Sequence, residues 1–244
     1  MIYRSNLTCP DLQPFFRHTH CRVMGHSQGH DVLSDFTDKS VEDPVFGIYK
    51  NCGFWTHDEA AILYNVARAI GGEWLDIGGL TGWTAAHEAA AGCRVTAVDT
   101  MYSVPDFRAR AEENLTLAGN MKRWKIVDLG KGTTAPQPDE VTLWTGTSNE
   151  FFTRDLRTFD GIVIDGDHSP PCPLQDAINA ATRIKPGGVI LFHDAIGEPV
   201  KEGYRYLQGL GWKLRIYKTP HVVALCYQDP FVPPEHISDP RVRV

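Results

Sequence analysis

Apolar residues recur with a helical period in some segments of residues 56–228 and form short continuous runs in others. The first helical segment is "THDEAAILYNVARAIGG", in which Thr56 and Glu59 have the spacing of a capping box and Gly71-Gly72 ends the apolar pattern. The same period predicts further helices over 83–92, 105–118 (with Gly119 as the stop), 174–184 and 199–208. Helices therefore recur along the whole segment.

Continuous apolar runs predict buried strands between these helices. The runs cover residues 73–78, 93–99, 141–146, 160–166, 189–194, 212–218 and 221–228, and a further short strand is expected around 124–129. Buried strands that alternate with helices are typical of a parallel sheet covered on both faces. The last two runs are separated by only a few residues around Pro220, which is too short for a parallel crossover. We predict an α/β fold with a Rossmann-like, doubly wound, mostly parallel seven-stranded sheet and an antiparallel last strand.

The flanking segments lack this alternation. Residues 1–55 show no sustained period, and we interpret them as an N-terminal extension that acts as a lid or as a contact in a homo-oligomer. Residues 56–228 form the predicted domain. Residues 229–244 are rich in proline and are expected to be an irregular tail.

Composition and charge narrow the classes of partner. A net charge of -6 argues against binding to a nucleic-acid backbone, which depends on clustered Lys and Arg. No apolar run approaches the ~18 residues that span a bilayer, and the N-terminus lacks the apolar core of a signal peptide. The six cysteines are scattered, as in reduced proteins. We expect a cytoplasmic protein that acts on a small molecule and binds neither nucleic acid nor membrane.

A glycine-rich loop follows the first predicted strand, in "LDIGGLTGW". It contains Asp76, Gly78, Gly79 and Gly82, and Asp99 closes the next strand. Glycines between a strand and a helix allow the backbone to approach a ligand beside the amide donors of the helix start. The nicotinamide fingerprint G-x-G-x-x-G fails because its first position falls on Ile77, so the match is to D/E-x-G-x-x-x-G.

This loop and Asp99 resemble those of class I S-adenosylmethionine-dependent methyltransferases. The resemblance implies S-adenosylmethionine as cofactor, with Gly78 and Gly82 facing its methionine part and Asp99 holding the ribose. Asp76 and Gly79 belong to the same cofactor loop. The chain has Leu80 where many members have another glycine. The family also places an adenine contact after the third strand, which implies Thr147 and Ser148.

Two polar groups follow predicted neighbouring strands, in "IDGDH" and "FHD". Asp165 ends one strand, and His193 and Asp194 end the other. The resemblance implies that these two parallel strands are neighbours, so the three side chains can converge at the carboxyl edge of the sheet. Two carboxylates and an imidazole can form one face of an octahedral metal site, which favours Mg²⁺ and leaves Mn²⁺ open. In the alternative interpretation Asp165 helps to seat the cofactor, and His193 and Asp194 cap the following loop.

Residues 56–228 are more specifically similar to small-molecule O-methyltransferases of the macrocin-type and cephalosporin-hydroxylase-like group, and more distantly to the catechol and caffeoyl-CoA enzymes. That resemblance rests on "FDGIVIDGDHS" and "IKPGGVILFHDA". It implies a divalent cation on Asp165, His193 and Asp194, although His193 stands where relatives commonly have Asp or Glu. Asp167 and His168 are then the candidates for the catalytic base, or else part of a hydrogen-bonded turn.

These residues predict an S-adenosylmethionine-dependent methyltransferase that acts on a hydroxyl of a small molecule with the help of a divalent metal. Two alternatives stay open. One is a metal-independent methyltransferase, and the other is a non-catalytic module that binds S-adenosylmethionine.

Overall fold

The computed structural model of the protein describes residues 6–10, 12, 41–43, 47–49, 55–122, 125–128, 140–237 and 242. Most of the N-terminal extension lies outside these residues. Within it, β1 (Val41–Asp43) and β2 (Gly47–Tyr49) pair antiparallel. Leu12 is buried in the core of the domain.

The main sheet has eight strands in the described part of the chain. From one edge to the other they are β5 (Lys125–Asp128), β6 (Glu140–Thr145), β4 (Arg94–Asp99), β3 (Glu73–Ile77), β7 (Phe159–Ile164), β8 (Ile184–Phe192), β10 (Val223–Tyr227) and β9 (Lys213–Tyr217). The first six run parallel, and β10 pairs antiparallel with β8 and with β9. The mostly parallel sheet with an antiparallel last strand is confirmed, and the short edge strand β5 adds an eighth strand to the seven.

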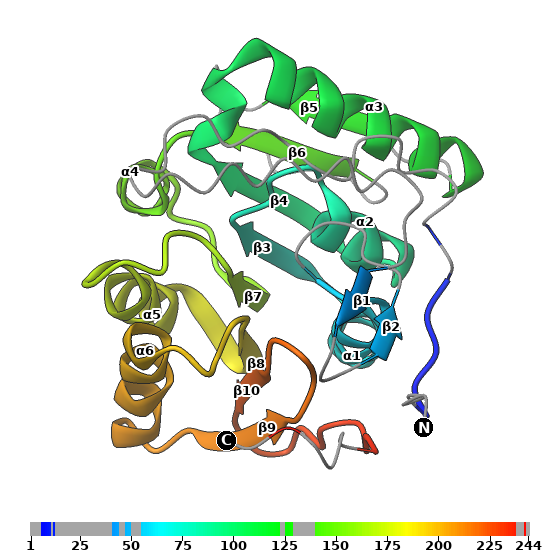
Figure 1. Cartoon of the computed structure of the whole chain (residues 1–244). Coiled ribbons are helices and arrows are strands. Elements are labelled where there is room, and N and C mark those ends of the chain that lie inside the picture. Colours follow the sequence, from blue (N-terminus) through cyan, green and yellow to red (C-terminus); the bar gives the residue numbers. More distant parts are fainter. Residues whose placement is uncertain are drawn as a thin grey trace.

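Helices cover both faces of this sheet (Figure 1). One face carries α1 (His57–Ile70), α2 (Trp83–Ala90) and α3 (Pro105–Lys122), and the other carries α4 (Ser148–Arg154), α5 (Cys172–Arg183) and α6 (Glu198–Gly209). Consecutive residues of a strand point to opposite faces, so Trp74 packs in the core under α1–α3 and Leu75 in the core under α4–α6. This double burial explains why the strands are continuously apolar.

Two predicted boundaries were wrong. Helix α3 continues through Gly119 to Lys122, because one glycine costs a helix only about 1 kcal/mol and the preceding Ala118 is buried in the core. Strand β8 begins at Ile184 instead of residue 189, so residues 185–188, which contain Pro186 and two glycines, lie inside the strand, where the pairing with β7 shifts register between Phe159 and Gly161. Pairing with β7 therefore outweighs the local preference of proline and glycine for a turn.

The predicted capping box of α1 is present. The Thr56 hydroxyl accepts from the backbone N–H of Glu59, and the Glu59 carboxylate accepts from the backbone N–H of Thr56. Residues 231–237 form neither helix nor strand. Among the described residues, no helix combines the length and the apolar character needed to cross a membrane.

Helix α2 buries a carboxyl group that should make stability depend on pH. Glu88 is fully buried, and neither carboxyl oxygen has a hydrogen-bond partner among the described residues. Burial, together with the nearby Asp76, raises the pKa of Glu88 well above its usual value of 4.5. The unfolded chain therefore loses this proton at a pH where the folded chain keeps it. The free energy of unfolding falls as the pH rises above 4.5, the usual pKa of a glutamate.

We predict that Glu88→Gln removes this contribution. The free energy of unfolding, measured by urea denaturation, should fall less between about pH 5 and about pH 8 in the variant than in the wild type. Glu202, which is exposed on α6, provides the control, and Glu202→Gln should keep the wild-type slope. Equal slopes for all three proteins would contradict a neutral buried Glu88.

Candidate active site

The glycine loop after β3 is held between the two neighbouring strands. The Gly78 N–H donates to Val98 O at 2.9 Å, and the Asp165 N–H donates to Ile77 O at 2.9 Å. Gly78 has a φ of +93°, and a Cβ added there would lie 2.1 Å from the Asp165 backbone oxygen. Only glycine fits this conformation and this close approach, so the loop lies directly against the end of β7.

Asp99 organises the same loop from the end of β4. Its carboxylate accepts from the backbone N–H of Leu80 and from that of Met101, each at 2.8 Å. Partial burial raises the pKa of Asp99, and the two amide bonds oppose that shift. Each carboxylate oxygen has a second acceptor position, so the side chain can still accept from a ligand.

Asp76 lies fully buried between β3 and α2. One carboxyl oxygen accepts from the Thr84 hydroxyl at 2.6 Å, and the other has no partner among the described residues. Burial, with added repulsion from Asp165 and Asp99, raises the pKa of Asp76 to about 7. Asp76 therefore links β3, which precedes the glycine loop, to α2, which follows it.

Asp165 and His193 meet at the ends of β7 and β8, as predicted from the strand order. His193 Nδ1 lies 3.2 Å from Asp165 Oδ1, and Trp55 Nε1 donates to Asp165 Oδ2 at 2.6 Å. The Trp55 indole also stacks on the His193 ring, with centroids 4.4 Å apart. Burial acts to raise the pKa of Asp165, but His193, His168 and Trp55 outweigh it and lower the pKa to about 2. Asp165 is therefore ionised.

His168 lies between Asp165 and Asp194. Its Nε2 is 3.4 Å from Asp165 Oδ1, and its Nδ1 is 3.5 Å from Asp194 Oδ2. Asp194 adopts a φ of +50°, a left-handed conformation that Asp tolerates better than most residues. The Asp165 carboxylate raises the pKa of His168. The three residues offer ligand atoms that all lie within 4.8 Å of one another.

Asp167 has a different environment from its neighbours. It is exposed, and its carboxylate accepts from the Ser169 N–H at 2.8 Å and faces the Cys172 thiol. The bond from Ser169 lowers the pKa of Asp167. Asp167 therefore uses its carboxylate in a turn, whereas His168 faces the carboxylates of Asp165 and Asp194.

A second cluster was not found from the sequence. It contains Glu59 of α1, His193, and His221 from the loop before β10, whose ligand atoms also lie within 4.8 Å of one another. The capping-box spacing of Glu59 indicated only a helix start, and nothing local distinguishes His221. The antiparallel pairing of Ala224 with Phe192 is what carries His221 to the end of β8.

Thr147 and Ser148 begin α4 at the end of β6. Thr147 forms a capping box with Glu150, and the Ser148 hydroxyl donates to Asp176 of α5. Burial, partly opposed by Ser148, raises the pKa of Asp176 to about 6. Both side chains therefore have structural partners at the edge of the sheet where the loop of Gly78 also lies.

Comparison with known proteins identifies the domain. A family model described as "Methyltransferase domain" matches residues 75–195, which include the glycine loop, Asp99, Asp165 and Asp194. The chain carries a methyltransferase domain. No curated protein matches the sequence.

Solved structures share the fold of this methyltransferase domain. They include an O-methyltransferase from Bacillus cereus in complex with SAH (17% identity, TM-score 0.52, covering 69% of this chain and 80% of that one). The O-methyltransferase TomG from Streptomyces achromogenes, in complex with SAM, is 15% identical with a TM-score of 0.53, covering 71% and 80%. A precorrin-6y C5,15-methyltransferase from Geobacter metallireducens is 15% identical with a TM-score of 0.53, covering 71% and 89%.

The close approach at Gly78 gives a test of the loop. Gly78→Ala should destabilise the domain more than Gly92→Ala, because Gly92 has a similar φ of +94° with nothing within 4 Å of an added Cβ. Backbone strain alone costs about 1–2 kcal/mol, and the collision with Asp165 adds to it. Denaturant midpoints of the two variants measure the difference, and equal midpoints would contradict the contact between the loop and β7.

Proposed function

We propose that this methyltransferase domain transfers a methyl group from S-adenosylmethionine to a hydroxyl of a small molecule. The observation that carries the proposal is the contact between the glycine loop and the end of β7. Gly78 packs against the Asp165 backbone, and the Asp165 side chain lies 3.4 Å from His168. A cofactor on this loop would therefore adjoin groups able to accept a proton.

The residues at the loop fit S-adenosylmethionine. The cofactor carries a sulfonium and an ammonium cation, and Asp76, Asp99 and Asp165 lie close enough that the charges of the other two raise the pKa of Asp76. Asp99 retains acceptor positions for ribose hydroxyls. When bound, S-adenosylmethionine supplies a methyl group on sulfur that an aligned acceptor oxygen displaces. The acidic residues would thus favour the charged donor over its neutral product.

The donor set of Asp165, His168 and Asp194 fits a divalent cation. His168 Nε2 is buried without a hydrogen bond among the described residues, although it faces Asp165. Oxygen and imidazole ligands suit Mg²⁺ or Mn²⁺, and such an ion would lower the pKa of an acceptor hydroxyl. The set implied by the family resemblance is also brought together, since His193 Nδ1 lies 3.2 Å from Asp165 Oδ1 and 3.5 Å from Asp194 Oδ2. We take His168 for this site because His193 Nε2 also faces Glu59.

A metal-independent reaction is the second candidate. His168 Nδ1 faces the Asp194 carboxylate, which would orient the ring and stabilise the imidazolium, and Nε2, which has no hydrogen bond among the described residues, would accept the proton. Asp167 is the weaker base, since its pKa is lowered and its carboxylate is used in the turn with Ser169.

Asp99→Ala should weaken S-adenosylmethionine binding, because it removes a charged acceptor for the ribose and the anchor of Leu80. Hydrogen bonds to charged groups are worth about 1.5–3 kcal/mol, so calorimetry should give a dissociation constant roughly 10- to 100-fold higher. Asp106→Ala, at the exposed start of α3, should bind as the wild type does. A wild-type chain that binds no S-adenosylmethionine would remove the proposed function altogether.

Chelation separates the two candidate mechanisms. With a panel of small phenols and sugars as acceptors, EDTA should abolish methylation and Mg²⁺ or Mn²⁺ should restore it, while Asp194→Ala should respond to neither ion. Full activity in EDTA, lost only in His168→Ala, would favour the metal-independent reaction. No methylation of any hydroxyl under either condition would contradict the acceptor class.

A further inference from the structure

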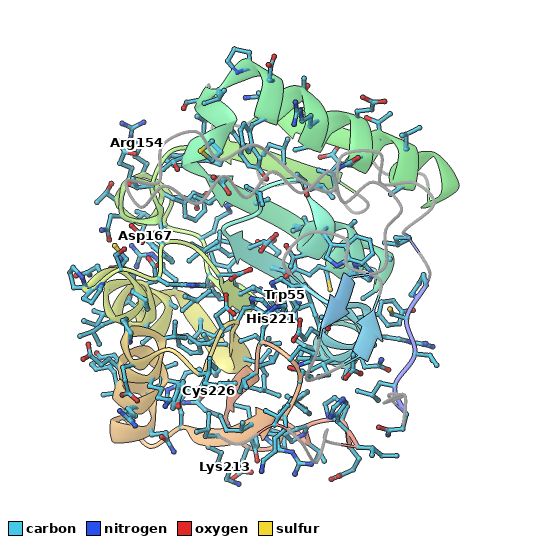
Figure 2. All side chains as sticks on the ribbon, viewed as in Figure 1. Trp55, Arg154, Asp167, Lys213, His221 and Cys226 are labelled. Atoms are coloured by element: carbon cyan, nitrogen blue, oxygen red, sulfur yellow. The ribbon has the colours of Figure 1, made fainter. Side chains whose placement is uncertain are left out.

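Glu59, His193 and His221 come from three separate elements and meet around one carboxylate oxygen. His193 Nε2 lies 3.3 Å from Glu59 Oε2, and His221 Nδ1 lies 3.1 Å from the same atom. Glu59 and His193 are fully buried, whereas the side chain of His221 is 34% exposed. The cluster is therefore enclosed on the side of α1 and β8 and reachable through His221. The rings of Trp55 and His221, both labelled in Figure 2, lie against His193 with centroids 4.4 and 5.2 Å from its ring.

The separations match those of ligands around zinc. Zn²⁺ binds imidazole nitrogen and carboxylate oxygen at about 2.0–2.1 Å, and tetrahedral geometry then places the ligand atoms about 3.3 Å apart. The two measured separations are 3.3 and 3.1 Å. Both distances also allow hydrogen bonds, although the 3.3 Å contact of His193 lies beyond the usual range of about 2.7–3.2 Å between nitrogen and oxygen.

The surroundings of the cluster have the features of an outer shell around a metal. A ligating histidine usually directs its second ring nitrogen to a carboxylate or carbonyl, and ligating carboxylates are themselves hydrogen-bonded. His193 Nδ1 faces Asp165 Oδ1 at 3.2 Å, and Trp55 stacks on the ring and fixes its plane. Glu59 Oε1 accepts from the His221 backbone N–H at 2.8 Å, and Oε2 accepts from that of Thr56 at 2.7 Å.

We propose that Glu59, His193 and His221 bind a zinc-class divalent ion. One carboxylate and two imidazoles form a donor set that suits Zn²⁺ and other late first-row metals better than Mg²⁺. This site shares no ligand with the Asp165, His168 and Asp194 cluster, and it does not depend on the proposed methylation. The ion joins the start of α1, the end of β8 and the loop before β10, and it holds His193 against Asp165.

Metal titration of the full chain tests the site. After chelator treatment, calorimetry should show a Zn²⁺ site that is present both in the wild type and in His168→Ala, in which the other cluster is broken, and Co²⁺ should give the visible absorption bands of a low-coordinate site. His221→Ala should weaken Zn²⁺ binding about 100-fold or more, since even outer-shell partners contribute about 10- to 100-fold. His168→Ala is the matched control, because this histidine lies in the other cluster, and it should keep wild-type affinity for Zn²⁺.

Two further measurements distinguish a failure of the zinc site from misfolding of a variant and from a failure of the proposed function. Zn²⁺ should raise the unfolding temperature of His168→Ala and leave that of the double variant His168→Ala, His221→Ala unchanged, and His221→Asn serves the same comparison if the alanine variant does not fold. Wild-type affinity for Zn²⁺ in His221→Ala, or no Zn²⁺ binding by the wild type, would overturn the site. Titration of the wild type with S-adenosylmethionine reports on the proposed function, and its failure with Zn²⁺ binding intact would overturn that proposal alone.

Discussion

Burial of carboxylates at the carboxyl edge of the sheet is the constraint on which the rest of this site depends. An unpaired charge taken out of water costs several kcal/mol, so each acid must find partners or keep its proton. Asp165 is ionised between Trp55, His193 and His168, whereas the pKa of Asp76 rises to about 7. Glu59 accepts from two backbone N–H groups in addition to its histidines. Each of these hydrogen-bonded carboxylates holds a neighbouring helix, strand or loop in place.

These partnerships connect elements that are far apart in the chain. Glu59 joins α1 to His193 at the end of β8 and to His221 in the loop before β10. The start of α1 is thereby tied to the end of β7 as well, since Trp55 donates to Asp165 and stacks on His193. These side chains therefore form one network. In it, His193 lies between the cluster of Asp165, His168 and Asp194, which faces the glycine loop, and the pair of Glu59 and His221, which lies under α1.

Patterns within short segments predicted most of the fold. The capping box at Thr56, the glycine loop and the buried strands were recognisable because helix caps and apolar periods are local properties. The boundaries that were wrong, at Gly119 and at the start of β8, lie where tertiary burial and strand pairing outweigh a weak local preference. The meeting of Asp165 with His193 followed from the rule that parallel strands end at one edge.

The sequence by itself determined a doubly wound α/β domain with a ligand-binding loop after its first parallel strand and polar residues at the ends of its later strands. Only the tertiary structure decided which of those residues act together. It placed the Asp167 carboxylate in a turn with Ser169, turned His193 Nε2 towards Glu59 and brought in His221. The physical reason is that strand and helix periods are encoded within a few residues, whereas the partners of a buried charge are selected by packing between elements that can be far apart, as Glu59 and His193 are at 134 residues.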